Sequence, residues 1–200
     1  NLDIIDVDGA ANFAADVTFA DGADLITASA GTSNFRAGVN AGNSITSGGN
    51  YNVVVGDEAG TALTTGDNNT FVGYASGDAV TTGGANSALG YAAGTNATTA
   101  DHNTFIGNSA GFTMTTGGSC VIVGSNAGYY LTTGSNNTAV GKDALQGPST
   151  GQSGTENVAV GMQCMLSNTT GGDNTAVGQV ALKSNTTGAS NVAIGRKALQ

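Results

Sequence analysis

The sequence predicts an all-β protein built as a parallel β-solenoid, or β-roll, of about ten 17-residue coils. Three observations predict this fold class. A short motif recurs at a nearly constant interval, glycine occupies two fixed places in each repeat, and a short segment of each repeat carries apolar side chains on both of its faces. Together they indicate stacked strands rather than a single packed core.

Ten glycines close the repeated motif and mark its period. We call them the anchor glycines: Gly38, Gly56, Gly73, Gly90, Gly107, Gly124, Gly141, Gly161, Gly178 and Gly195. Successive anchors are 18, 17, 17, 17, 17, 17, 20, 17 and 17 residues apart, a regularity that composition alone does not produce. The chain is therefore expected to be a repeat protein.

The length of the repeat unit indicates which class of repeat protein this is. Helical hairpin repeats need units of about 33 residues or more. A second glycine lies seven residues before nearly every anchor, as at Gly66 and Gly83. Because glycine reaches positive φ without steric cost, each unit is expected to hold two short strands and two glycine-assisted turns. Units of this kind stack about 4.8 Å apart, so ten of them form a rod roughly 48 Å long.

Asparagine lies four residues before the anchor in nine of the ten units, and Cys120 takes this place in the other. Stacked asparagine side chains can hydrogen-bond from coil to coil as an amide ladder. The predicted ladder residues are Asn69, Asn86, Asn103, Asn137, Asn157, Asn174 and Asn191. The predicted turn glycines that accompany them are Gly73, Gly90, Gly107, Gly124, Gly141, Gly161, Gly178 and Gly195.

The segment before each anchor is apolar on both faces. Side chains alternate across a strand, so the residues three and one before the anchor share one face, as Val121 and Val123 do. The opposite face carries the asparagine and a residue such as Phe105 or Ala139. Apolar character on both sides indicates burial on both sides. We therefore expect one face to fill the coil and the other to pack against identical chains in a symmetric homo-oligomer.

The repeats divide the chain into two parts, an acidic, β-rich N-terminal segment at residues 1–30 and a solenoid domain at residues 31–200. The first part holds six aspartates and no lysine or arginine; it reads as a solvated acidic segment, with calcium binding as the alternative. The 20-residue interval contains Pro148, and its excess is expected to loop out of one turn. Asn1 in place of methionine suggests processing or truncation, and we expect the coil that ends at Gln200 to be covered by further chain or another copy.

The motif Asn-(Thr/Ser/Val)-(Ala/Val/Phe)-(Val/Ile/Leu)-Gly, as in residues 157–161 and 191–195, resembles the repeat of trimeric autotransporter adhesin heads. The wider pattern, with Thr-Thr-Gly and a following Ala-Leu, resembles the repeat regions of phage tail fibres. The resemblance covers residues 31–200. It implies a homotrimeric, left-handed parallel β-roll that acts in attachment to a surface, with a host glycan or protein as the bound partner.

Composition and missing motifs exclude several classes of function. A net charge of −9 with 10% charged residues argues against binding to nucleic acid or to anionic membrane surfaces. No apolar run reaches the roughly 20 residues of a membrane span. His102 is the only histidine, and Asp57, Glu58, Asp67 and Asp78 occupy turn positions, so we predict neither an enzyme nor a metal or cofactor site.

Two further residue types have competing interpretations, and the two cysteines have a single one. The Thr-Thr pairs, such as Thr81-Thr82, predict a turn-stabilising threonine ladder; ice binding is the alternative, but only one outward rank of threonine would form. Tyrosines near the turns, at positions 74, 91, 129 and 130, are expected to pack between coils, with stacking on a sugar as the alternative. Cys120 and Cys164 lie two coils apart, roughly 10 Å, beyond the reach of a disulfide.

These observations predict a non-enzymatic structural or adhesive component of an extracellular fibre, on a virion or a cell surface. Its main partner is expected to be the same chain in a homotrimer. The alternative is a filament subunit that polymerises end to end through the open ends of the solenoid.

Overall fold

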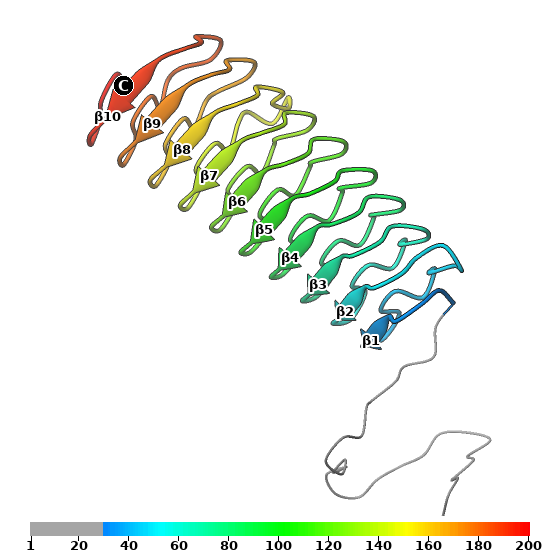
Figure 1. Cartoon of the computed structure of the whole chain (residues 1–200). Coiled ribbons are helices and arrows are strands. Elements are labelled where there is room, and N and C mark those ends of the chain that lie inside the picture. Colours follow the sequence, from blue (N-terminus) through cyan, green and yellow to red (C-terminus); the bar gives the residue numbers. More distant parts are fainter. Residues whose placement is uncertain (1–29) are drawn as a thin grey trace, which may run out of the picture.

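Each repeat contributes one three-residue strand, and the ten strands form a single parallel sheet in chain order (Figure 1). The computed structural model describes residues 30–200. The strands are β1 (Phe35–Ala37), β2 (Val53–Val55), β3 (Thr70–Val72), β4 (Ser87–Leu89), β5 (Thr104–Ile106), β6 (Val121–Val123), β7 (Thr138–Val140), β8 (Val158–Val160), β9 (Thr175–Val177) and β10 (Val192–Ile194). The predicted all-β parallel solenoid of about 17-residue coils is confirmed. The predicted N-terminal segment, residues 1–30, lies outside the described residues except for its last residue.

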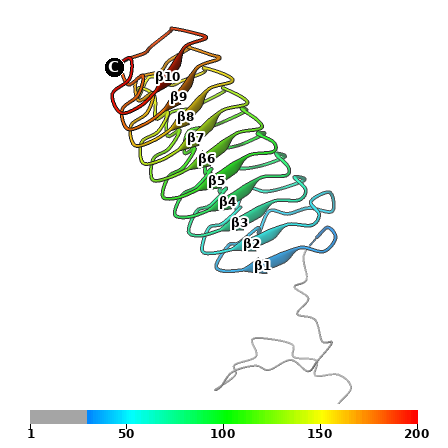
Figure 2. The ribbon, with the colours of Figure 1, turned by 60° about the vertical axis from the view of Figure 1, so that its left-hand side comes forward.

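Equivalent residues of successive repeats pair with one another along the whole sheet. Val54 pairs with Phe71, and Ala139 pairs with Ala159 across the one 20-residue interval. The extra residues of that interval therefore lie outside the strands and leave the register unchanged. Seen from the side, the coils lie one above another as a straight stack (Figure 2). At about 4.8 Å per coil, the nine steps from β1 to β10 span roughly 43 Å.

The expectation of two strands per repeat was wrong. In residues 30–200 only the segment before each anchor is a strand. After the anchor the chain adopts positive φ twice, as at Glu58 (φ 57°) and Gly60 (φ 53°), which bends it away from an extended path. Hydrogen bonds between coils nevertheless continue there, since the Ala62 amide donates to the Asp78 carbonyl at 2.9 Å. The second half of each coil is thus a stack of turns with paired backbones.

From Gly49 onward, the second glycine of the repeat serves a different purpose from the one expected. Gly83 and Gly117 do not adopt positive φ. Instead, a Cβ atom on Gly117 would lie 2.5 Å from the carbonyl oxygen of Gly134 in the next coil. Glycine is therefore favoured at Gly117 by the close approach of two backbones rather than by its conformational freedom.

The interior is filled by the middle residue of each strand and by residues from the turn half of the coil. In the N-terminal half, large middle residues lie against glycines, as Phe105 does against Gly94 and Gly111. In the C-terminal half the middle residue is alanine, as at Ala139, and the place of the glycine is taken by a large side chain, as at Leu145. Leu145 accepts a positive φ of 49° to do so. The large side chain thus stands in the middle of the strand in one half of the rod and four residues after the anchor glycine in the other half. The interior stays filled in both.

The inserted residues place a glutamine in the interior. Gln152 is 1% exposed and bridges to Leu131, so it occupies the interior column that holds Met114 and Leu131 in earlier coils. Neither its Oε1 nor its Nε2 has a hydrogen-bond partner. A buried amide without partners destabilises the folded state.

We predict that Gln152→Leu raises the free energy of unfolding by about 1–3 kcal/mol, because it removes two unsatisfied polar atoms and extends the leucine column. Chemical denaturation followed by circular dichroism measures this. Asn168→Leu is the matched comparison, since Asn168 is equally buried but its Nδ2 donates to the Gly171 carbonyl at 2.9 Å. Destabilisation by both substitutions would contradict the prediction.

Candidate functional site

The sheet turns one face into the coil and the other outward. The middle residue of every strand from β2 to β10 is buried, whereas the first and third residues are half-buried or exposed. We call the first residues of the ten strands the leading row and the third residues the trailing row. Together they form the outer band, which is the candidate functional surface.

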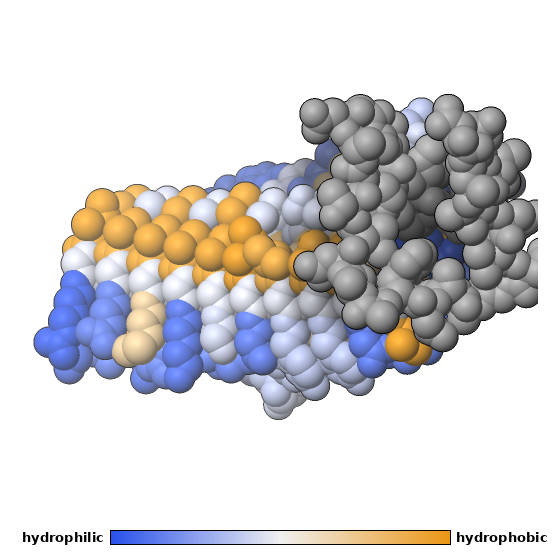
Figure 3. Space-filling model, turned by 90° about the horizontal axis from the view of Figure 1, so that it is seen from below, coloured by the Kyte–Doolittle hydropathy of each residue, from blue (hydrophilic) through white to orange (hydrophobic). Residues whose placement is uncertain are grey.

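The outer band is uncharged, and its trailing row is apolar along its whole length. The trailing row reads Ala37, Val55, Val72, Leu89, Ile106, Val123, Val140, Val160, Val177 and Ile194. The leading row mixes valine with threonine and has Ser87 as its smallest member and Phe35 as its largest. None of the residues in either row is charged. Where grey atoms do not cover the rod, Figure 3 shows a continuous apolar band that is bordered on one side by a pale row and then by mainly hydrophilic residues.

Several side chains of the outer band are well exposed. Leu89 is 52% exposed, Ile106 39% and Val121 42%. Neighbours in the same row cover the sides of each residue, but nothing in residues 30–200 covers their tips. Contiguous apolar patches larger than a few hundred Å² are uncommon on soluble monomers and mark interaction sites.

A shallow depression interrupts the band where the side chains are smallest. It encloses about 220 Å³ and is lined by Thr70, Val72, Ser87, Ala88, Leu89 and Ile106. These residues come from β3, β4 and β5. The depression exists because Ser87 is shorter than Thr70 and Thr104, its neighbours in the leading row.

The asparagine ladder lies on the inner side of the sheet. The Oδ1 atom of Asn86 accepts the backbone N–H of Asn103 at 3.0 Å and its Nδ2–H at 3.1 Å. The Nδ2 atom of Asn86 donates to the Ala100 carbonyl at 2.7 Å. Equivalent bonds recur from Asn34 to Asn103 and from Asn137 to Asn191, and they tie each coil to the next inside the rod.

Cys120 interrupts the ladder without breaking the stack. Its backbone N–H donates to Asn103 Oδ1 at 2.9 Å, and its sulfur accepts the Asn137 N–H at 3.4 Å. Cys120 and Cys164 are both buried and unpaired. Burial raises the pKa of the Cys120 thiol and raises that of Cys164 to about 11. Both thiols therefore stay protonated and poorly reactive near neutral pH.

The two threonines of each Thr-Thr pair lie in different environments. The hydroxyl of the first threonine bonds the next coil, as Thr81 Oγ1 does to the Thr98 carbonyl at 3.0 Å. The second threonine, such as Thr82 or Thr116, is exposed. The outward threonines thus form a single rank.

Aromatic side chains stack on one another between coils. The rings of Tyr74 and Tyr91 lie 5.3 Å apart and nearly parallel, and Phe112 and Tyr129 are 5.0 Å apart. Tyr130 meets Tyr129 edge to face at 4.7 Å. In each of the two parallel pairs, one face of each ring is taken up by its neighbour.

The residues considered for catalysis all lie outside the strands. His102 lies in a turn at positive φ, and Asp67 Oδ1 accepts the Asn50 N–H at 2.6 Å. The carboxylate of Glu58 accepts hydrogen bonds from Asn40 Nδ2 and from the Thr61 hydroxyl. Residues 30–200 contain no group of three or more His, Cys, Asp or Glu side chains that could hold a metal ion. The same range contains no helix long and apolar enough to span a bilayer.

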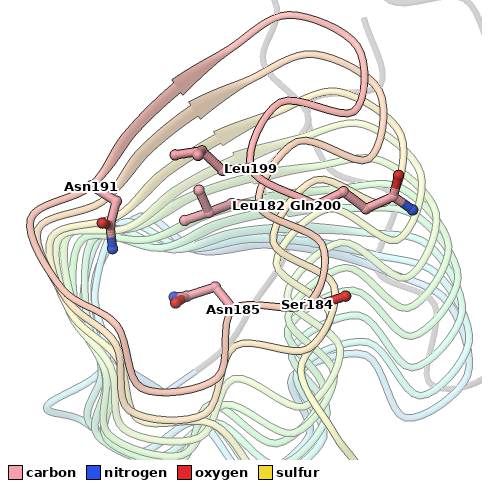
Figure 4. A pocket seen from close by; sticks show the side chains of 6 residues that line it. All are labelled: Leu182, Ser184, Asn185, Asn191, Leu199 and Gln200. Carbon is pink, nitrogen blue, oxygen red and sulfur yellow. The ribbon is translucent and has the colours of Figure 1, made fainter.

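The last coil exposes part of the solenoid interior. A cavity of about 310 Å³ is lined by Leu182, Ser184, Asn185, Asn191, Leu199 and Gln200. Figure 4 shows the side chains of Asn185 and Asn191 at the opening of the coil, together with those of Leu182 and Leu199. Asn185 Nδ2 donates to Asn168 Oδ1 at 3.1 Å, which begins a second, shorter amide ladder beside the first. The cavity therefore lies where the stacked side chains of the coil interior reach the surface, beside Leu182.

The sequence pattern had identified both rows of the outer band as one face of a strand. It had not identified the depression at β4, because its only sequence signal is a serine in a row of threonine and valine. Comparison with protein-family models, with curated proteins and with solved structures gives no match.

Proposed function

We propose that this chain is the shaft or head of an extracellular homotrimeric fibre, in which identical solenoids pack side by side through the outer band. The single observation that carries the proposal is the uncharged apolar face that runs the full length of the sheet. Burying such a face removes apolar surface from water at about 25 cal/mol per Å². The gain is repeated at each of the ten coils.

A second copy of this chain fits the band better than other partners do. The side chains of the band recur with the coil spacing of about 4.8 Å, and another solenoid of the same sequence presents the same spacing over the same length. The rows contain no charge that would recognise a phosphate or a carboxylate. A net charge of −9 also disfavours nucleic acid and anionic lipid.

The copy number and the biological setting rest on the sequence resemblance. The Asn-x-(Ala/Val/Phe)-(Val/Ile/Leu)-Gly repeats resemble those of trimeric adhesin heads and phage tail fibres, which supports three chains, a location on a virion or cell surface, and a role in attachment to a host glycan or protein. The rod shape and the rung-to-rung ladders suit this role, because they resist pulling along the fibre without a large core. No side chain is assigned a catalytic role.

We predict that Ile106→Lys converts the assembly into monomers. Ile106 lies in the middle of the trailing row and is 39% exposed, so lysine is accepted in the folded monomer. In the assembly its charge would be buried among apolar side chains and near its own copies, which weakens association by about tenfold or more. Sedimentation velocity over a range of protein concentrations measures the change.

Thr116→Lys is the matched control, since it adds the same charge at an exposed position outside the outer band. It should leave the mass of the assembly unchanged. A parent chain that is folded and monomeric at micromolar concentration would refute side-by-side assembly. Long filaments in electron micrographs that survive Ile106→Lys would instead favour end-to-end polymerisation.

A further inference from the structure

Strand β4 places a small and a large side chain next to each other on the outer band. Ser87 is the smallest residue of the leading row, and Leu89 in the trailing row of the same strand is 52% exposed. The depression of about 220 Å³ opens beside Ser87, and Leu89 forms part of its wall. A socket and a protruding side chain thus lie at the same level of the rod.

We propose that the copies in the fibre lie parallel and in register, with Leu89 of each copy inserted in the depression beside Ser87 of the next copy. This inference rests on the proposed side-by-side assembly and specifies how its chains are aligned. The occupant is a second copy of this chain.

The geometry of cyclic assembly supports this pairing. When an axis parallel to the rods relates the chains, the trailing row of one chain faces the leading row of the next at the same height. The protruding Leu89 then meets the socket beside Ser87, strand for strand. Strand β1 shows the same complementarity in reverse, because its large leading residue is Phe35 and its small trailing residue is Ala37. A large side chain therefore meets a small one at both strands where the rows depart most from threonine and valine.

The depression also distinguishes the in-register alignment of two rods from alignments that are shifted by one coil. Rows of threonine and valine repeat at every coil, so two such rods can slide by one coil, about 4.8 Å, with little change in contact. A slip of one coil would place Leu89 against Thr70 or Thr104, which are larger than serine. It would bring Ile106 or Val72, respectively, to the depression in place of Leu89. The crowded leucine disfavours both slipped alignments, and the smaller Val72 leaves part of the depression unfilled in one of them.

Disulfide trapping between two full-length variants tests the alignment. Chains carrying Ser87→Cys are expressed together with chains carrying Leu89→Cys, one of them with a mass tag, and are exposed to a mild oxidant. The control pairs combine Ser87→Cys with Val55→Cys or Val123→Cys, trailing-row positions two coils away on either side. Cys120 and Cys164 stay in place, because both are buried and their raised thiol pKa values keep them unreactive.

The expected result is about tenfold more mixed dimer on denaturing gels for the 87–89 pair than for either control pair, because two coils exceed the reach of a disulfide. Stronger linking of a control pair, or an absence of linking in all pairs from an oligomeric sample, would overturn the in-register alignment. Sedimentation of the same samples separates this outcome from failure of the proposed function: a monomeric parent refutes the assembly itself, whereas an oligomer with other cross-links refutes only the alignment.

Discussion

Gly124→Ala is expected to lower the free energy of unfolding by about 3–5 kcal/mol, because it combines backbone strain with a steric clash. Gly124 has a φ of +135°, which side chains rarely adopt. An added Cβ would lie 2.5 Å from the carbonyl oxygen of Gly141 and 2.6 Å from its carbon. Both atoms belong to the backbone of the next coil, so relief requires the coils to move apart. Chemical denaturation measures the loss.

Gly195→Ala separates the two contributions. Gly195 has a similar φ of +118°, but a Cβ placed there meets no atom within 4 Å among the described residues. We expect it to destabilise the fold by only about 1–2 kcal/mol, from strain alone. Equal losses for the two variants would show that the contact between coils is unimportant. The same experiment reports whether the unfolding transition of Gly124→Ala splits in two, as expected when one interface of a linear stack is weakened.

The second prediction with a large effect on stability concerns the side-chain volumes at two interior positions of one coil. Phe105→Ala is expected to destabilise the fold by about 3–5 kcal/mol, since Phe105 is fully buried and its ring fills the space over two glycines. Gly111→Leu alone should also destabilise, by about 2 kcal/mol or more, because its side chain would collide with that ring.

The double variant Phe105→Ala/Gly111→Leu reproduces the combination found at Ala139 and Leu145. It should recover part of the loss, with a coupling free energy of about 1–3 kcal/mol between the two sites. A double-mutant cycle of denaturation measurements supplies this value. Additive losses would mean that the side chains at positions 105 and 111 do not compensate for each other in filling the interior.

Much of the fold follows from local spacing in the sequence. The anchors give the period, the length of the unit excludes helical hairpins, and period-two alternation places Val121 and Val123 on one face and Ile122 on the other. The position of Asn137 and its equivalents likewise follows from the repeat. These features could be predicted because a solenoid repeats one local pattern and each coil contacts only its neighbours.

Other features depend on contacts between coils. The insertion moves Gln152 into a column of apolar residues, and only the pairing with Leu131 shows this. The socket at β4 arises from Ser87 lying between Thr70 and Thr104, residues 17 positions away on either side. The second glycine of the repeat is favoured by the close approach of the next backbone, which the spacing of residues does not reveal.

The sequence by itself determined the period, the parallel stacking and the two sets of side chains on each strand. Only the tertiary structure decided which set lies inside. Alternation assigns residues to faces, but it does not say toward which face the chain turns after the strand. That turn combines the anchor glycines with residues two positions later, such as Glu58, Asn126 and Val180, which also adopt positive φ but carry no common sequence signal. Their bends enclose the asparagine face, where every amide is hydrogen-bonded, and leave the valine and threonine face as the outer band.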